Sequence, residues 1–475
     1  MPSVKNGASI ICLFLIMLIL AGSLFTVSTA SDETQTPIKH VIYIMMENHS
    51  FDNFFGVYPG NSTSLGIEIP TNLINRSGGV VQVPQLSAVP PGTFNTQNPG
   101  ESVYRQDFDN GAMDGFATYS GPQAMTYFTS SQLAIEWDWA EEYGLGDNYF
   151  SSVLAQTTPN RLFSLAGYTP VMTDTGPPPY VPFNRTIFSQ LSEYGVSWKV
   201  YGGYASSYPM NFFLGIDSYS GTNFGSWGSF QQDLGNGNLP EFSYVSSLGS
   251  SDVDQHPSDN VTFGEVWLSG IVNEVMQSQY WNSSVIFINY DEGGGYYDQV
   301  PPPMLDGMQL GFRVPFLVIS PFSKEGYVSH TEMNHDSILG FVEYNWNIPA
   351  LNSFVSDSYL PLDFFDFSQT PRAPLIFTDS STFPAPIQIP FHQLNYSRIG
   401  SSDINLANLK DYTTKQTTSQ STSSYPLTST NNMTSLSEVS NSGSVSYGVI
   451  LGVVITIAAL TVVAGIIQNK KRRAT

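Results

Sequence analysis

The chain has 475 residues and is strongly acidic, with 39 Asp and Glu residues, 17 Lys and Arg residues and a formal net charge of −22. This length allows roughly two or three average domains, or one α/β sheet with long insertions. The charge argues against nucleic acid as a partner, because proteins that bind nucleic acid need clustered positive charge.

Residues 1–30 have the pattern of a secretory signal peptide. Lys5 precedes an apolar stretch at residues 10–21, and small residues at 28–30 resemble a cleavage site. An uncleaved N-terminal anchor is the alternative. Cys12, the only cysteine of the sequence, lies in this segment, so we expect no disulfide in the exported chain.

Residues 31–410 alternate between strand-like and helix-like segments. Buried strands are predicted at 41–46, 196–201, 285–290 and 314–320, and helices at 130–143, 161–166, 263–278 and 336–345. We therefore expect an α/β fold with a central, mostly parallel sheet flanked by helices. The segments 58–100 and 202–251, rich in Gly, Pro or aromatic residues, are expected to be long inserted loops or small lobes.

Polar side chains directly follow two of these strands. The strand at 41–46 precedes Glu47, Asn48 and His49, and the strand at 285–290 precedes Asp291 and Glu292. Ligands of open α/β sheets bind outside the carboxyl ends of the strands. The two segments thus predict one shared site with oxygen ligands. The alternative is two ordinary strand exits with solvated acids.

A third segment, TTPNRL at residues 157–162, places two hydroxyl groups before a proline that would begin a helix. Proline is favoured in the first helical turn, and the free N–H groups there can hold an anion such as phosphate. An ordinary N-cap role for Thr157 or Thr158 is the alternative interpretation.

Together these segments resemble the phosphoesterase family of non-specific phospholipases C and acid phosphatase A, within the alkaline phosphatase superfamily. The resemblance rests on the motifs ENHSFDNFFG, NGAMDGF, TTPNRL, YDEGGGYYDQVPPP and GFRVPFLVISPFSKEGYVSHTEMNHDS. It implies an alkaline-phosphatase-like fold. It also implies a metal-dependent hydrolase of phosphate esters, of the acid phosphatase or phospholipase C type.

The resemblance also implies roles for individual residues. Thr157 matches the family's nucleophile, which would form a phosphothreonine that water hydrolyses. His256 and His335 match active-site histidines, which would stabilise the transferring oxygens or protonate the leaving alcohol. The ligands of one divalent metal ion of unknown identity would be Glu47, Asn48, Thr157, Asp291 and Glu292. Arg161 and His49 are candidate substrate-binding residues, although a buried ion pair is an equally open role for Arg161.

The sequence departs from the family pattern at three places. Relatives often have a histidine where this chain has Gly293, and another where it has Gln299. A histidine that usually precedes the MDGF segment is also missing. These changes keep the oxygen ligands but remove imidazoles, which leaves protonation of the leaving group and the substrate range open.

The C-terminal part predicts a membrane anchor. Residues 411–446 form a Ser/Thr-rich stalk, 447–467 an apolar segment of about bilayer-spanning length, and 468–475 a basic tail expected in the cytoplasm. A buried core helix is the alternative for 447–467. We therefore expect a single-pass protein of the cell membrane with an extracellular main domain. Glycosylation triplets fit this address and occur at Asn61, Asn75, Asn184, Asn260, Asn282, Asn395 and Asn432.

Two other functions compete with a phosphoesterase. The segment TTPNR has the outline of the sulfatase signature, but threonine cannot become the formylglycine that sulfatases need. A catalytically silent surface protein that kept the fold is the second alternative.

Overall fold

The computed structural model describes residues 34–60, 72–74, 80–82, 87–88, 103–174, 181–247 and 253–376. The predicted signal peptide, stalk, transmembrane helix and basic tail lie outside these residues, as does most of the segment 58–100. Among the helices of the described residues, none is both long and apolar enough to cross a membrane.

An eight-stranded sheet forms the centre of the fold. Its strands are β1 (His40–Met46), β6 (Gly144–Gly146), β9 (Trp198–Tyr201), β11 (Phe224–Gly225), β12 (Phe242–Ser246), β13 (Ser284–Tyr290), β16 (Phe316–Ile319) and β17 (Tyr327–Ser329). Their order is β11-β9-β12-β1-β13-β16-β6-β17. Neighbours in this sheet are parallel, except that β16 is antiparallel to both β13 and β6. The sheet is therefore mixed and mostly parallel.

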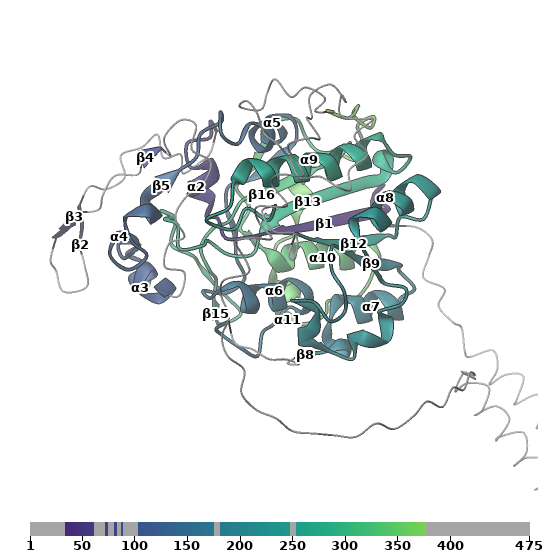
Figure 1. Ribbon diagram of the computed structural model, residues 1–475, viewed down its shortest axis with the longest axis horizontal. Helices are drawn as coiled ribbons and strands as arrows, with labels where there is room; N and C mark the ends of the chain where they lie inside the picture. Colours follow the sequence, from purple (N-terminus) through teal and green to yellow (C-terminus); the bar gives the residue numbers. More distant parts are fainter. Residues whose placement is uncertain are drawn as a thin grey trace, which may run out of the picture. The chain divides into compact units, whose positions relative to one another are not determined.

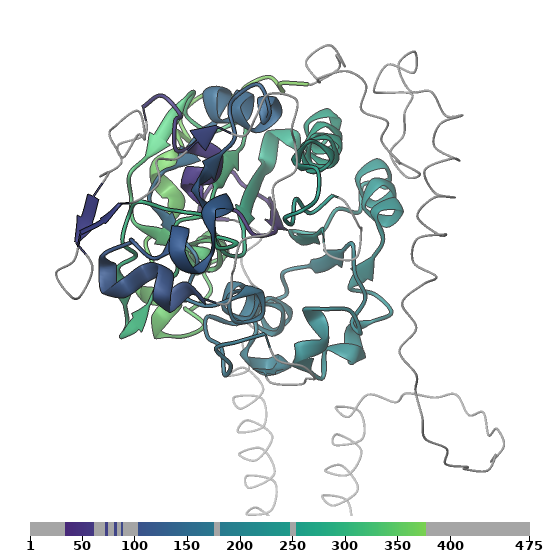
Figure 2. The same ribbon diagram turned by 60° about the vertical axis from the view of Figure 1, so that its left-hand side comes forward.

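Helices cover both faces of the sheet (Figures 1 and 2). One layer holds α5 (Ala134–Glu142), α8 (Trp227–Asn236) and α9 (Val261–Gln277), and the other holds α6 (Thr157–Ala166), α7 (Ile187–Glu193), α10 (His335–Asn345) and α11 (Ser353–Asp357). Every residue of β13 and all but the first of β1 are buried. This burial on two faces explains why both strands are nearly continuous apolar runs.

Shorter helices and strand pairs complete the described part of the fold. The short helices are α2 (Phe51–Phe55), α3 (Tyr104–Phe108) and α4 (Phe116–Tyr119). The short strands pair as β2 (Asn72–Ile74) with β3 (Val80–Gln82), β4 (Ser87–Ala88) with β5 (Thr126–Tyr127), β7 (Tyr149–Phe150) with β18 (Met333–Asn334), β8 (Val181–Pro182) with β10 (Phe213–Leu214), and β14 (Met304–Leu305) with β15 (Met308–Gln309).

The predicted strands correspond to β1, β9, β13 and β16, and the predicted helices to α5, α6, α9 and α10. The prediction of a long inserted loop or small lobe at 202–251 is wrong in part, because this segment contains α8 and the sheet strand β12. The β12 sequence, FSYVS, includes two serines that are buried beside β1 and β9. Its neighbours in the sheet, rather than its own apolar character, make it a core strand.

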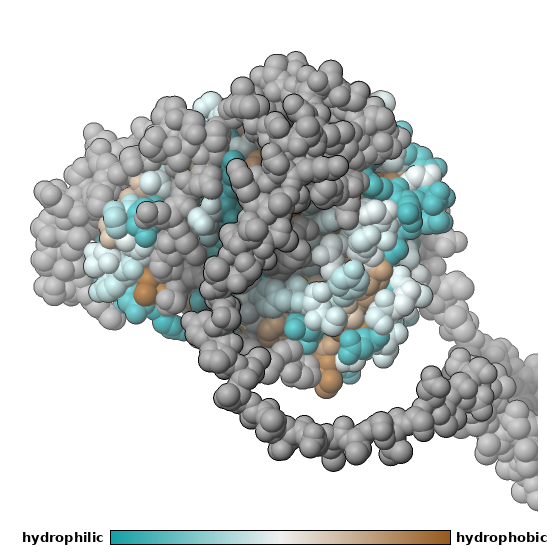
Figure 3. Space-filling view, in the orientation of Figure 1, coloured by the Kyte–Doolittle hydropathy of each residue, from teal (hydrophilic) through white to brown (hydrophobic). Residues whose placement is uncertain are grey.

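Apolar residues are scattered over the described part of the face that Figure 3 shows, among hydrophilic and intermediate ones. The large apolar side chains that are exposed come from separate elements: Tyr119, Met172, Tyr204, Leu214, Met304, Tyr344 and Tyr359. Isolated apolar residues of this kind are normal on a soluble surface.

Candidate active site

The carboxyl ends of β1 and β13 lie side by side. The two strands pair in parallel over their whole length, with Met46 opposite Tyr290. Glu47 and Asp291 are the next residues of each strand, so they leave the sheet at the same edge. The structure thus brings together the two polar strand ends that the sequence predicts to share a site.

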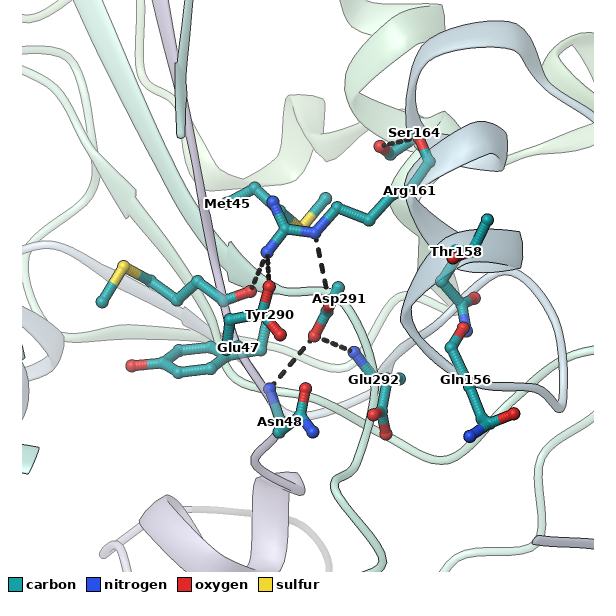
Figure 4. Close-up of polar contacts among 12 residues, drawn as sticks. Met45, Glu47, Asn48, Gln156, Thr158, Arg161, Ser164, Tyr290, Asp291 and Glu292 are labelled. Atoms are coloured by element: carbon teal, nitrogen blue, oxygen red, sulfur yellow. Dashed lines mark hydrogen bonds and ion pairs between the residues drawn. The ribbon is translucent and has the colours of Figure 1, made fainter. Parts of the chain in front are cut away.

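Arg161 of α6 joins these two acids (Figure 4). Its Nη2 atom lies 2.5 Å from Glu47 Oε1, and its Nε atom lies 3.2 Å from Asp291 Oδ2. The side chains of Arg161 and Asp291 are 0% exposed, and that of Glu47 is 3% exposed. Arg161 therefore has the buried ion-pair role. Its guanidinium is fully buried in this structure and has no surface that a substrate could contact, which contradicts the prediction of direct substrate binding.

The acids outnumber the cation that joins them. Burial raises the pKa of Glu47 well above its ordinary value, the charge of Asp291 raises it further, and Arg161 opposes both effects. Two carboxylates share one guanidinium, so the strand ends carry surplus negative charge. Such a surplus favours a bound cation or proton.

Asn48 links both strand ends to His256. Its backbone is in the left-handed region, with φ of 55°, which asparagine tolerates better than most residues. Its N–H donates to Asp291 Oδ1 at 3.0 Å, and its side-chain Nδ2 lies 3.3 Å from His256 Nε2. The absence of a side chain at Gly294 lets the two segments approach closely, since a Cβ atom there would lie 2.2 Å from the Asn48 carbonyl oxygen.

The predicted metal ligands are brought together only in part. Glu47, Asn48 and Asp291 are neighbours, and the Glu292 N–H donates to Asp291 Oδ1 at 2.9 Å, while the Glu292 carboxylate accepts a hydrogen bond from the Tyr104 hydroxyl. Across the described ranges, no three acidic, histidine or cysteine side chains are grouped so that they could hold a metal ion. In donor type and in charge, the oxygen ligands at the strand ends fit a hard divalent cation.

Thr157 is the first residue of α6 and is partly exposed. Arg161 follows it by one turn, so both side chains lie on the same face of the helix. Asn160 shapes the approach to this turn, because its Oδ1 atom accepts the Val153 N–H at 3.0 Å and its Nδ2 atom donates to the Ala155 carbonyl at 2.8 Å. The helix thus presents Thr157 above the buried ion pair.

Two residues that the sequence analysis missed contact the same helical turn. Asp174 Oδ1 accepts the Thr158 N–H at 2.7 Å, and the Tyr208 hydroxyl lies 3.0 Å from Thr158 Oγ1. Asp174 is a single exposed acid in a loop, and Tyr208 is one of many aromatic residues in segment 202–251. Neither had a local signal that could have identified it.

The two predicted catalytic histidines differ in exposure. His256 is partly exposed beside Asn48, and its backbone N–H donates to Asp254 Oδ1 at 3.1 Å. His335 is fully buried at the start of α10, where its Nε2 lies 3.0 Å from the Tyr290 carbonyl oxygen. Burial lowers the pKa of His335 to about 4, which keeps it neutral. His335 therefore contacts the turn before Asp291, and of these two histidines only His256 has an exposed surface.

His49 also has a supporting position rather than the predicted substrate-binding one. Its ring is fully buried, with Nδ1 2.7 Å from Asn53 Oδ1 and Nε2 2.7 Å from the Gln255 carbonyl oxygen. It stacks on Tyr296 with a centroid distance of 5.0 Å. Burial lowers its pKa to about 4. His49 thus anchors the loop that carries His256.

A second buried arginine fixes α2 beneath the site. Arg313 Nη2 lies 2.9 Å from Asp52 Oδ1, and Arg313 Nε lies 2.8 Å from Asp298 Oδ1. Burial raises the pKa of Asp52 to about 8, the charge of Asp298 adds to this rise, and Arg313 opposes it. This network ties the segment after Asn48 to the segment after Glu292.

Comparisons with known proteins identify relatives of this chain. Phospholipase C B of Mycobacterium tuberculosis (strain ATCC 25618 / H37Rv) is 28% identical over 395 residues, which cover 67% of this chain and 75% of the relative. Non-specific phospholipase C1 of Arabidopsis thaliana is 27% identical over 396 residues, which cover 72% of this chain and 73% of the relative.

One solved structure, of a protein in the alkaline phosphatase superfamily from Vibrio parahaemolyticus, matches with a TM-score of 0.34 and 13% identity over 70% of this chain and 73% of that one. The profile of the Phosphoesterase family matches residues 38–349, which include both strand ends, α6 and both histidines. This match covers more than half of the sequence, and the chain therefore belongs to the Phosphoesterase family.

Proposed function

We propose that this chain hydrolyses phosphate esters through Thr157 as nucleophile. As a family member it is a hydrolase of phosphoric ester bonds. The observation that carries the proposal is the ion pair of Arg161 with Glu47 and Asp291, since it ties the helix that begins at Thr157 to the two polar strand ends.

The reaction follows a double displacement. The Thr157 hydroxyl gives up its proton to solvent as its oxygen attacks phosphorus, forms a phosphothreonine and displaces the alcohol of the ester. His256, which is partly exposed next to Asn48, gives a proton to the departing alcohol. Water then hydrolyses the phosphothreonine and releases phosphate or a phosphomonoester, depending on the substrate.

The chain's own charges orient the phosphate group. The positive end of the α6 dipole lies at Thr157, the first residue of the helix. Arg161 offsets part of the negative charge of Glu47 and Asp291 one turn below. These features favour an anionic group at the point where Thr157 attacks.

We also propose that one divalent cation binds at the strand ends. Glu47, Asn48, Thr157, Asp291 and Glu292 are the residues that would hold it. When bound, it would supply positive charge against the phosphate oxygens and lower the pKa of the attacking hydroxyl. The surplus negative charge of Glu47 and Asp291 supports this proposal.

The proposed place of action is outside the cell, with the chain anchored by residues 447–467. The composition of residues 1–30 and 447–475 supports this proposal. Accessibility of the intact chain to an external protease, together with retention in the membrane after alkaline extraction, measures both parts of it.

The decisive experiment compares Thr157→Ala with Thr157→Ser and the parent. The substrates are p-nitrophenyl phosphate, p-nitrophenylphosphorylcholine and phosphatidylcholine. We expect Thr157→Ala to lose roughly 10³-fold or more in kcat, because removal of a catalytic nucleophile costs up to ~10⁶-fold in other hydrolases. Thr157→Ser keeps a hydroxyl and should keep measurable activity.

Acid quenching during turnover provides a second readout. Mass spectrometry should then detect phosphate on Thr157 in the parent and none in Thr157→Ala. Near-normal turnover by Thr157→Ala would remove Thr157 as the nucleophile. No turnover by the parent with any of the three substrates and several divalent metals would favour a silent surface protein.

A further inference from the structure

Gln255 lies directly before His256 and is completely buried. Its backbone is in the left-handed region, with φ of 64°, which is unusual for a residue with a long side chain. This conformation turns the Gln255 side chain into the core while His256 remains at the surface. Neighbouring residues of one loop thus point into different environments.

The Gln255 side chain closes a ring of hydrogen bonds with two other residues. Its Nε2 atom donates to Glu136 Oε2 at 3.3 Å, and its Oε1 atom accepts from the Tyr290 hydroxyl. The Tyr290 hydroxyl also lies 2.6 Å from Glu136 Oε1. The other Nε2 hydrogen bond goes to the Val261 carbonyl at 3.0 Å, which fixes the orientation of the amide.

The number of hydrogen atoms available in this ring determines the protonation state of Glu136. The Tyr290 hydroxyl has one hydrogen and faces two oxygen atoms, so both contacts are hydrogen bonds only when Glu136 carries a proton. Neutral Glu136 then donates to Tyr290, Tyr290 donates to Gln255, and Gln255 donates back to Glu136. Burial raises the pKa of Glu136 to about 7, which agrees with this neutral form.

The ring connects the two halves of the site. Tyr290 is the last residue of β13 and directly precedes Asp291, whereas Gln255 directly precedes His256. Close contacts on two sides hold Gln255 in this position. A Cβ atom at Gly264 would lie 2.1 Å from Gln255 Cγ, and His49 Nε2 holds the Gln255 carbonyl at 2.7 Å.

We propose that Gln255 is a positioning residue, which holds His256 in place for proton transfer to the leaving alcohol through its closed hydrogen-bond ring with Glu136 and Tyr290. This inference rests on the proposed function, because that function makes His256 the proton donor. The inference goes beyond the proposed function because it assigns a role to three buried residues that touch no substrate.

The test uses leaving groups that differ in their need for a proton. An alkyl phosphate ester releases a basic alkoxide, which must be protonated, whereas p-nitrophenolate leaves without a proton. We expect Gln255→Leu to lower kcat for the alkyl ester by about 10- to 100-fold, because small displacements of a catalytic group cost up to ~10²-fold. Its kcat for p-nitrophenyl phosphate should change by less than about three-fold.

Three further variants complete the design. Tyr290→Phe removes one hydroxyl without changing the packing volume, and it should show the same leaving-group dependence. Glu136→Gln keeps the ring, because its amide can donate to Tyr290 and accept from Gln255, so it should retain parental rates with both esters. Val266→Ala is the matched control for a buried change on α9 outside the ring.

A double-mutant cycle with His256→Ala identifies the route of the effect. If Gln255 acts through His256, Gln255→Leu should have no further effect on the alkyl ester once His256 is absent. Should Gln255→Leu fail to fold, Tyr290→Phe replaces it in the same cycle.

The outcomes separate this inference from the proposed function. Equal slowing of both esters by Gln255→Leu or Tyr290→Phe, or parental rates with both, would overturn the positioning role while Thr157→Ala still tests the nucleophile. An inactive parent, or an active Thr157→Ala variant, would instead overturn the function itself.

Discussion

Replacing Arg161 with Met tests the central ion pair of the site. The substitution removes the cation that Glu47 and Asp291 share and leaves a side chain of similar length. All three side chains are at most 3% exposed, so water cannot replace the lost guanidinium without opening the core. The variant therefore measures what the ion pair contributes to the joining of α6 with the strand ends.

The expected loss of stability is large. Removing one partner of a buried ion pair costs about 3–5 kcal/mol, because it leaves uncompensated charge in the core. A typical domain has a free energy of unfolding of about 5–15 kcal/mol, so this loss is a substantial fraction of the total. Arg372→Met is the matched control. Its ion pair with Glu142 is partly exposed and should contribute only about 0–1 kcal/mol.

The loss should depend on pH in a defined direction. The pKa of Glu47 in the folded protein already lies well above its ordinary value of 4.5, and removing Arg161 raises it further. A carboxyl group with a raised pKa in the folded state lowers stability as the pH rises above its unfolded value. The difference between variant and parent should therefore be small at low pH, where Glu47 is protonated in both proteins, and should grow only once the pH passes the raised pKa of Glu47 in the parent.

Urea unfolding at pH 4 and pH 8, followed by tryptophan fluorescence, measures this difference. The triple variant Arg161→Met, Glu47→Gln, Asp291→Asn should recover most of the stability, because it removes the unpaired charges together with the cation. A loss below about 1 kcal/mol at pH 8, as for an exposed pair, would refute the reasoning. So would a loss that becomes smaller between pH 4 and pH 8.

Two further predictions concern the loops around the site. Asp174→Asn removes the carboxylate that accepts the Thr158 N–H, so we expect the KM for a dianionic monoester to fall about two- to five-fold more than that for a monoanionic diester. Equal changes for the two substrates would contradict a charge effect. Gly294→Ala should cost more than about 1–3 kcal/mol in urea unfolding, because its φ is +64° and its Cβ would meet the Asn48 carbonyl oxygen at 2.2 Å. Gly307→Ala, with φ of +75° and open space around it, isolates the cost of backbone conformation alone, and an equal loss at both positions would exclude the close contact.

Much of the fold could be predicted because burial leaves a local pattern. The apolar runs before Glu47 and Asp291 are β1 and β13, and the helix predicted after the Pro159 turn is the C-terminal part of α6. The prediction failed for β12, which is short and contains serines. A strand of this kind becomes buried through its neighbours in the sheet, which no local pattern records.

The candidate site divides in the same way. The sequence indicated which residues could do chemistry, because Thr157, Glu47 and Asp291 each stand at the end of a recognisable element. It could not distinguish His256 from His335 or His49. Their difference in burial comes from segments far away in the chain, including the loop of Gln255 that closes over His49.

By itself, therefore, the sequence determined the main elements of the sheet, the polar residues at their ends and membership of a family. Tertiary structure alone decided that Arg161 joins the strand ends, that two of the predicted site histidines are fully buried, and that Gln255 joins Glu136 and Tyr290. These relations depend on strand order and on contacts between residues far apart in the chain, from 35 positions for Gln255 and Tyr290 to 206 positions for His49 and Gln255. Only the folded arrangement sets the burial and charge on which their chemistry depends.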